Sequence, residues 1–128
     1  MKIIDSDSLP LGKTVILPAP YLLFLGDIEE PAFAKTAFGL KDWASHLCIG
    51  ELVCSADAVT TGLPRLSPAQ AYERGARALV IGVANPGGSI PEAWIPSLVE
   101  AMEAGLEIVG GMHAHLSSIP RLQQTAEA

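Results

Sequence analysis

Four apolar runs alternate along the chain with stretches in which apolar residues recur at helical spacing. The runs are short and mostly continuous, as is typical of strands that are buried on both faces of a parallel sheet. They are Tyr21–Leu25, Leu47–Val53, Ala78–Ala84 and Leu106–Met112. A further short strand at Thr14–Leu17 is left open, so the pattern predicts about four to five strands.

A helix is expected after the first strand, because Pro31 suits a first helical position, where its missing N–H loses no hydrogen bond. This helix should reach about Trp43. Its apolar stripe is Phe33, Ala37 and Leu40.

Two capping boxes, Ser67–Gln70 and Ser89–Glu92, predict the starts of two further helices. The first should end near Gly75, and Gly105 should end the second. The apolar residues of the second helix follow the spacing i, i+3, i+4 and i+7, at Ile95, Leu98, Val99 and Met102.

Strands and helices alternate four times, with a last helix expected after Ser117 or Ser118. Such alternation predicts an α/β domain of the Rossmann-like kind, a parallel sheet with right-handed crossovers and helices on both faces. The length of 128 residues suits one domain. We interpret residues 1–19 as a lead-in and residues 20–128 as the domain.

Ligands of such sheets bind outside the carboxyl ends of the strands. Gly87 and Gly88 lie in the loop after the third strand, where they leave the backbone open in front of a capped helix N-terminus that offers free N–H groups. The alternative is that both glycines only permit a tight turn. The expected ligand-binding residues are Gly26, Asn85, Gly87, Gly88, Ser89 and His115.

Asp27 and His113 are the candidate catalytic residues. Asp27 directly follows the first strand and could bind a hydroxyl or an amine, act as a base, or only favour the next helix N-terminus. His113 or His115 could line the pocket as a donor or proton carrier, or belong to an ordinary loop. A metal site would need Asp27, Asp57 or His46 as further ligands, and no spacing signature supports one, so no metal is expected.

The sequence does not match either of two common nucleotide-binding motifs. The stretch from Gly26 to Thr36 resembles a phosphate-binding loop, but Ala34 precedes Lys35 where that loop requires glycine. No G-x-G-x-x-G sequence follows the first strand.

The charge balance restricts the partners. The formal net charge is −6, with only 8 Lys and Arg residues, and these form no cluster, which argues against nucleic acid. No apolar stretch has the roughly 20 residues of a membrane span, and the acidic start of the chain is unlike a signal peptide. We therefore expect a cytoplasmic protein with a small-molecule substrate.

Cys48 and Cys54 lie on or beside one predicted strand, roughly 20 Å apart if it is extended, which is too far for a disulfide. We expect free thiols, buried or half-buried.

Three segments carry a family resemblance: "APYLLFLGD…AKTAFGL", "GLPRLSPAQA" and "GARALVIGVANPGGSIPEAWIPSLVEAMEAGLEIVGGMHAHL". They resemble the N-terminal domain of a bacterial family long described as being of unknown function. Its characterised members are D-glutamate (D-amino acid) N-acetyltransferases. The resemblance implies acetyl transfer from acetyl-CoA to the amine of a D-amino acid.

Proteins of that family are much longer, because a P-loop-like C-terminal domain follows this Rossmann-like domain. The resemblance therefore implies that this chain is a fragment, inactive alone, whose partner is that C-terminal domain and whose co-substrate is acetyl-CoA.

A weaker similarity links the layout around "EAGLEIV" to CoA-binding domains of the succinyl-CoA synthetase type. This analogy places Asn85, Gly87, Gly88 and His113 beside the cofactor or acceptor.

Three hypotheses follow. The chain is part of an acetyltransferase, a nucleotide- or CoA-binding module without chemistry, or a structural domain. The mean hydropathy of +0.35 favours some covered apolar surface, and a homo-oligomer is left open.

Overall fold

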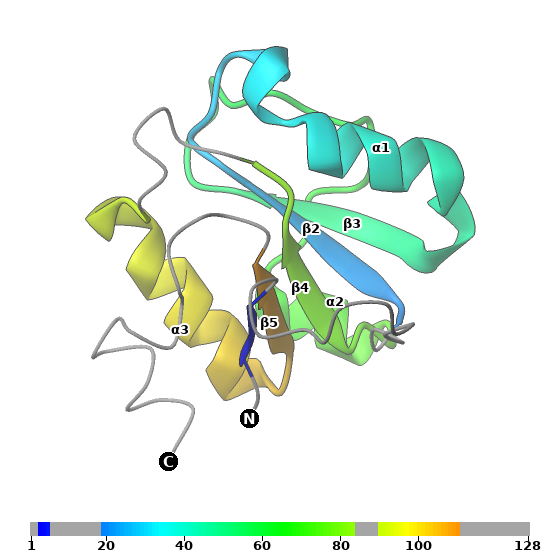
Figure 1. The fold of residues 1–128 in the computed structure, drawn as a ribbon. Helices are drawn as coiled ribbons and strands as arrows, with labels where there is room; N and C mark the ends of the chain where they lie inside the picture. Colours follow the sequence, from blue (N-terminus) through cyan, green and yellow to red (C-terminus); the bar gives the residue numbers. More distant parts are fainter. Residues whose placement is uncertain (1–2, 6–18, 84–89, 111–128) are drawn as a thin grey trace.

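The computed structural model describes residues 3–5, 19–83 and 90–110, which form a five-stranded sheet with helices on both faces (Figure 1). The strands are β1 (Ile3–Asp5), β2 (Tyr21–Gly26), β3 (Cys48–Val53), β4 (Ala78–Ile81) and β5 (Glu107–Gly110). Their order is β1-β5-β4-β2-β3, and every neighbouring pair is parallel. The predicted Rossmann-like α/β class is confirmed.

Strand β1 lies within the segment that we interpreted as a lead-in. Ile3 pairs with Ile108 and Asp5 with Gly110, so β1 extends the sheet beyond β5. Two isoleucines before an aspartate are too short a pattern to predict a strand. The expected strand Thr14–Leu17 lies outside the described residues.

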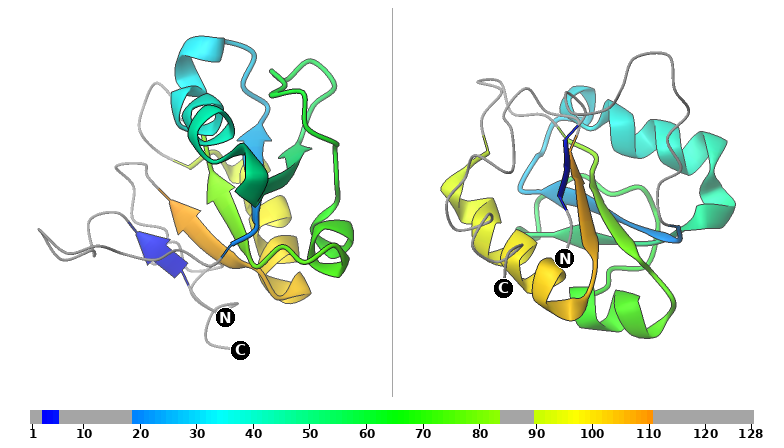
Figure 2. Two further views of the ribbon diagram at one scale, coloured as in Figure 1. Left: turned by 90° about the vertical axis from the view of Figure 1, so that its right-hand side faces the viewer. Right: turned by 60° about the horizontal axis from the view of Figure 1, so that its bottom comes forward.

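The helices are α1 (Lys35–Trp43), α2 (Pro68–Glu73) and α3 (Ile95–Ala104). Helix α1 covers one face of the sheet, and α2 and α3 cover the other (Figures 1 and 2). This division follows from the strand order, because the chain moves from β2 to β3 in one direction and from β3 to β4 in the other. No helix in the described ranges is long and apolar enough to span a membrane.

The helix boundaries follow the local signals closely. Ser67 and Gln70 form the predicted capping box, with the Gln70 N–H donating to Ser67 Oγ at 3.2 Å. Gly105 ends α3 in the left-handed conformation, at φ +107°. Pro31 begins a single 3-10 turn and α1 itself begins at Lys35, later than expected.

The second capping box lies partly outside the described residues, because Ser89 is not among them. Glu92 begins a 3-10 turn that runs to Trp94, and α3 starts after it.

Strand β2 is buried along its whole length, as its apolar sequence predicts. The close contact between β4 and α1 requires glycine just after β4, because a Cβ on Gly82 would lie 2.5 Å from the Cβ of Ala37. The Ala37 N–H donates to the Gly82 carbonyl at 3.0 Å, which holds α1 against the sheet.

The strand order places a topological switch between β2 and β4. From β2 the chain leads to β3 on one side, and it returns past β2 to form β4 on the other. Open α/β sheets bind ligands beyond the carboxyl ends of the strands at such a switch. In this chain that place lies beside Gly26, Asp27 and Gly82.

Candidate functional site

The candidate site begins at the last residue of β2, Gly26, which the indole of Trp94 covers. Gly26 has φ +59°, and an added Cβ would lie 2.7 Å from both Cε2 and Nε1 of Trp94. Trp94 is fully buried, and its ring packs edge-to-face on Phe24 with the centroids 5.3 Å apart. Both the backbone conformation and the close indole therefore require glycine here.

Asp27 is exposed, and the neighbouring indole orients its carboxylate. Trp94 Nε1 donates to Asp27 Oδ1 at 2.8 Å. The other oxygen, Oδ2, accepts no hydrogen bond from the described residues. Trp94 thus orients the exposed Asp27 carboxylate, a group suited to bind an amine or accept a proton.

The loop after β3 is hydrogen-bonded to both backbone neighbours of Asp27. The Cys54 N–H donates to the Gly26 carbonyl and the Val59 N–H to the Ile28 carbonyl, both at 2.8 Å. Cys54 Sγ also lies 3.5 Å from the Ser97 hydroxyl in the first turn of α3. The ends of β2 and β3 and the start of α3 therefore meet at one place.

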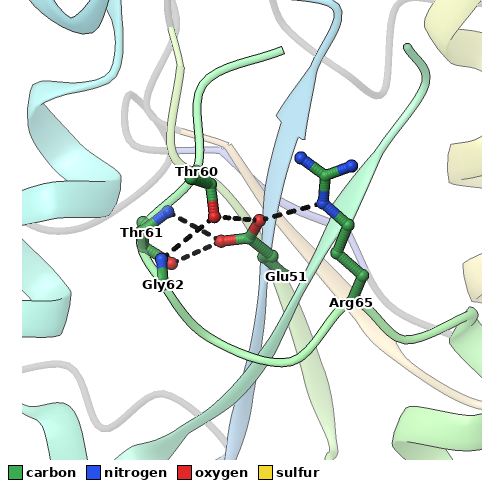
Figure 3. A network of polar contacts seen from close by, with 5 residues as sticks. All are labelled: Glu51, Thr60, Thr61, Gly62 and Arg65. Atoms are coloured by element: carbon green, nitrogen blue, oxygen red, sulfur yellow. Dashed lines mark hydrogen bonds and ion pairs between the residues drawn. The ribbon is translucent and has the colours of Figure 1, made fainter. Parts of the chain in front are cut away.

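A buried carboxylate holds the far end of this loop (Figure 3). Glu51, in β3, is fully buried. It accepts hydrogen bonds from the Thr60 hydroxyl at 2.7 Å and from the Thr61 N–H and hydroxyl at 2.7 and 2.6 Å. Arg65 Nε lies 3.5 Å from the same carboxylate. Every oxygen of Glu51 is thus bonded, which makes its burial tolerable.

The structure brings Gly26 and Asp27, two of the predicted site residues, together with Cys54, Trp94 and Ser97. The other predicted site residues lie outside the described residues. They are Asn85, Gly87, Gly88, Ser89, His113 and His115.

His46 and Asp27, two residues that a metal site could have used, do not lie together. His46 lies in a 3-10 turn before β3, at the amino end of the sheet, whereas Asp27 lies at the carboxyl end. Within the described ranges, no three His, Cys, Asp or Glu side chains gather as metal ligands.

Sequence reasoning missed Cys54, Ser97 and Glu51 as neighbours of the site. Cys54 directly follows β3 as Asp27 follows β2, so the strand-end rule could have found it. Glu51 carried a weaker signal, a charge within an apolar strand, which is uncommon unless the charge is paired.

The two free thiols differ in exposure, and we expect them to differ in reactivity. Cys48 is buried, and burial raises the pKa of its thiol above its ordinary value. Cys54 is exposed, which corrects our expectation that both thiols would be at least half-buried. Thiolates are the reactive form, so at pH 8 Cys54 should be alkylated by iodoacetamide about tenfold or more faster than Cys48. Peptide mapping after timed labelling measures this ratio, and equal rates would contradict the packing of β3.

Residues 48–128 match a family described as "Domain of unknown function (DUF1611_N) Rossmann-like domain". The match covers more than half of the chain. The chain belongs to this family.

A solved DUF1611 family protein from Anabaena variabilis has the same fold. It is 27% identical to this chain, with a TM-score of 0.65 over 84% of this chain and 34% of that one.

Two relatives of this DUF1611_N domain are named D-glutamate N-acetyltransferase. The Pseudoalteromonas protein is 42% identical over 103 residues, covering 80% of this chain and 31% of its own length. The Tritonibacter scottomollicae protein is 39% identical over 113 residues, covering 88% of this chain and 34% of its own. The chain therefore spans about a third of the length of the relatives it matches.

Proposed function

We propose that this chain is the N-terminal domain of an acetyltransferase that moves acetyl from acetyl-CoA to the amine of D-glutamate or a related D-amino acid. The names of the two relatives suggest the reaction. The structural observation that supports the proposal is the exposed Asp27 carboxylate, which Trp94 orients at the switch between β2 and β4.

The proposed reaction needs a group that binds the substrate ammonium and accepts its proton. The substrate amine is an ammonium at neutral pH, and it must lose a proton before its nitrogen attacks the thioester carbonyl. A C–N bond then forms, the C–S bond breaks, and the sulfur of CoA leaves and takes up a proton. In the proposal Asp27 binds the ammonium, and Asp27 or His113 accepts its proton.

The remaining predicted residues complete the proposed site. In the proposal Asn85, Gly87, Gly88 and Ser89, which follow β4 in the sequence, bind acetyl-CoA, and Gly26 and His115 border the acceptor. This assignment rests on their place in the sequence after β2, β4 and β5.

Two further carboxylates lie in the loop that carries Asp27. Glu29 and Glu30 are exposed in the same loop, so the local field attracts an ammonium and repels carboxylates and phosphates. D-Glutamate and CoA also carry negative groups, which need positive groups as partners. We propose that the C-terminal part of a longer protein supplies them, in the cytoplasm, and that neither nucleic acid nor a membrane is a partner; a homo-oligomer stays a proposal of the same kind.

A chimera tests the function directly. This chain replaces the matching 31% of the Pseudoalteromonas relative, and acetyl transfer from acetyl-CoA is measured with D-glutamate, L-glutamate and D-alanine. We expect turnover with D-glutamate by the chimera and none by the 128-residue chain alone. A folded chimera that binds acetyl-CoA without turnover would favour a binding module instead.

A further inference from the structure

Glu51 has a role that the fold alone does not require. Strand β3 lies at the edge of the sheet, and backbone hydrogen bonds already cover that edge. The Glu51 N–H donates to the Pro64 carbonyl at 2.9 Å, and the Leu66 N–H donates to the Glu51 carbonyl at 3.0 Å. The segment that returns from the loop therefore protects the strand without help from the Glu51 side chain.

A buried carboxylate is a costly choice at such a position. Removing a charged group from water costs several kcal/mol, by an order-of-magnitude estimate, unless hydrogen bonds compensate fully. The only charged partner in the described residues is Arg65, whose side chain is 46% exposed. The other bonds come from Thr60 and Thr61, so the carboxylate serves mainly to hold these two residues.

Thr60 and Thr61 lie directly beside the backbone hydrogen bonds that join the loop to Gly26 and Ile28. Thr60 follows Val59, whose N–H bonds the carbonyl of Ile28, and the same loop begins with the bond from Cys54 to Gly26. The loop is therefore hydrogen-bonded to the backbone on both sides of Asp27. Between Val59 and Pro64, the hydrogen bonds from the described loop residues to the sheet are those to the Glu51 carboxylate, so Glu51 is the polar anchor of this end of the loop.

We infer that Glu51 is a positioning residue for the candidate site, acting through the Cys54–Gly62 loop on the backbone of Asp27. The inference that this matters for acetyl transfer rests on the proposed function. The mechanical part, that the Glu51 carboxylate fixes the loop against Gly26 and Ile28, does not.

Hydrogen exchange tests the mechanical part in the 128-residue chain. Glu51→Gln keeps the shape of the side chain but gives it an N–H₂ group, which cannot accept from either Thr60 or Arg65. The amides of Cys54 and Val59 should then exchange about tenfold or more faster, because their bonds to Gly26 and Ile28 open locally. The amides of β4 should be unchanged.

Matched variants separate the loop from overall stability. Thr61→Val removes one donor to Glu51 and should act in the same direction, whereas Thr61→Ser keeps the hydroxyl and should restore slow exchange. Glu107→Gln, on β5, is a control outside the network. Unchanged exchange at Cys54 and Val59 in Glu51→Gln would overturn the inference, as would equal acceleration in β4.

The chimera tests the consequence for catalysis. Glu51→Gln should lower kcat for D-glutamate about tenfold or more while the KM for acetyl-CoA changes less than threefold. The reason is that the loop is hydrogen-bonded to the backbone beside Asp27, which binds the amine in the proposed function. An unchanged kcat with accelerated exchange would overturn the positioning role. If the unsubstituted chimera shows no turnover, the proposed function fails, and the exchange result still decides whether Glu51 holds the loop.

Discussion

Replacing Asp27 by Asn in the chimera is expected to lower kcat/KM for D-glutamate about 100-fold, the lower range for the loss of a general base. Asn has almost the same shape, and its amide oxygen can still accept from Trp94 Nε1. The substitution therefore removes the charge and the proton-accepting ability and leaves the packing unchanged. Initial rates of CoA release at varied D-glutamate concentrations measure the effect.

Asp57→Asn is the matched control for this experiment. Asp57 is also an exposed aspartate in a loop at the carboxyl end of the sheet, but its described contact is a backbone bond to Ser55. Its turnover should stay within about twofold of the unsubstituted chimera, as expected for a surface change. Equal turnover in Asp27→Asn and Asp57→Asn would remove Asp27 from the mechanism.

Trp94→Ala is expected to destabilise the chain by about 3–5 kcal/mol, the range for truncating a large buried aromatic side chain. The substitution opens a cavity beside Phe24 and Gly26, and it removes the partner of the Asp27 carboxylate. Domains of this size are stable by about 5–15 kcal/mol, so a large share of the stability is lost. Urea unfolding followed by circular dichroism measures the change in midpoint.

Trp43 offers a control with the same chemistry. Its side chain is 89% exposed at the end of α1. Trp43→Ala should therefore change the free energy of unfolding by no more than about 0.5 kcal/mol. Similar destabilisation by both substitutions would show that Trp94 is not the buried residue on which the site is built.

Local signals in the sequence predicted most of the fold, because each depends on residues close together in the chain. The apolar run of β2 reports burial on both faces, the box of Ser67 and Gln70 satisfies free N–H groups within one turn, and Gly105 adopts a conformation that other residues avoid. The alternation of these elements then predicts the parallel sheet.

Asp27 could be chosen from the sequence for a similar reason. The carboxyl ends of parallel strands lie at one edge, so a polar residue directly after a buried strand lies where ligands bind. The same rule did not predict which residue donates a hydrogen bond to Asp27. Trp94 lies 67 residues away, and no local pattern links the two residues.

The sequence by itself determined the class of fold and the position of most helices and strands, and it predicted the edge of the sheet at which a ligand site is expected. Only the tertiary structure decided that β1 joins β5, that Trp94 covers Gly26 and orients Asp27, and that Glu51 anchors the loop beside them. The physical reason is the range of the interactions. Periodicity and capping act within a few residues, whereas these contacts form only when packing closes long stretches of chain, and their energy depends on a geometry that no local pattern records.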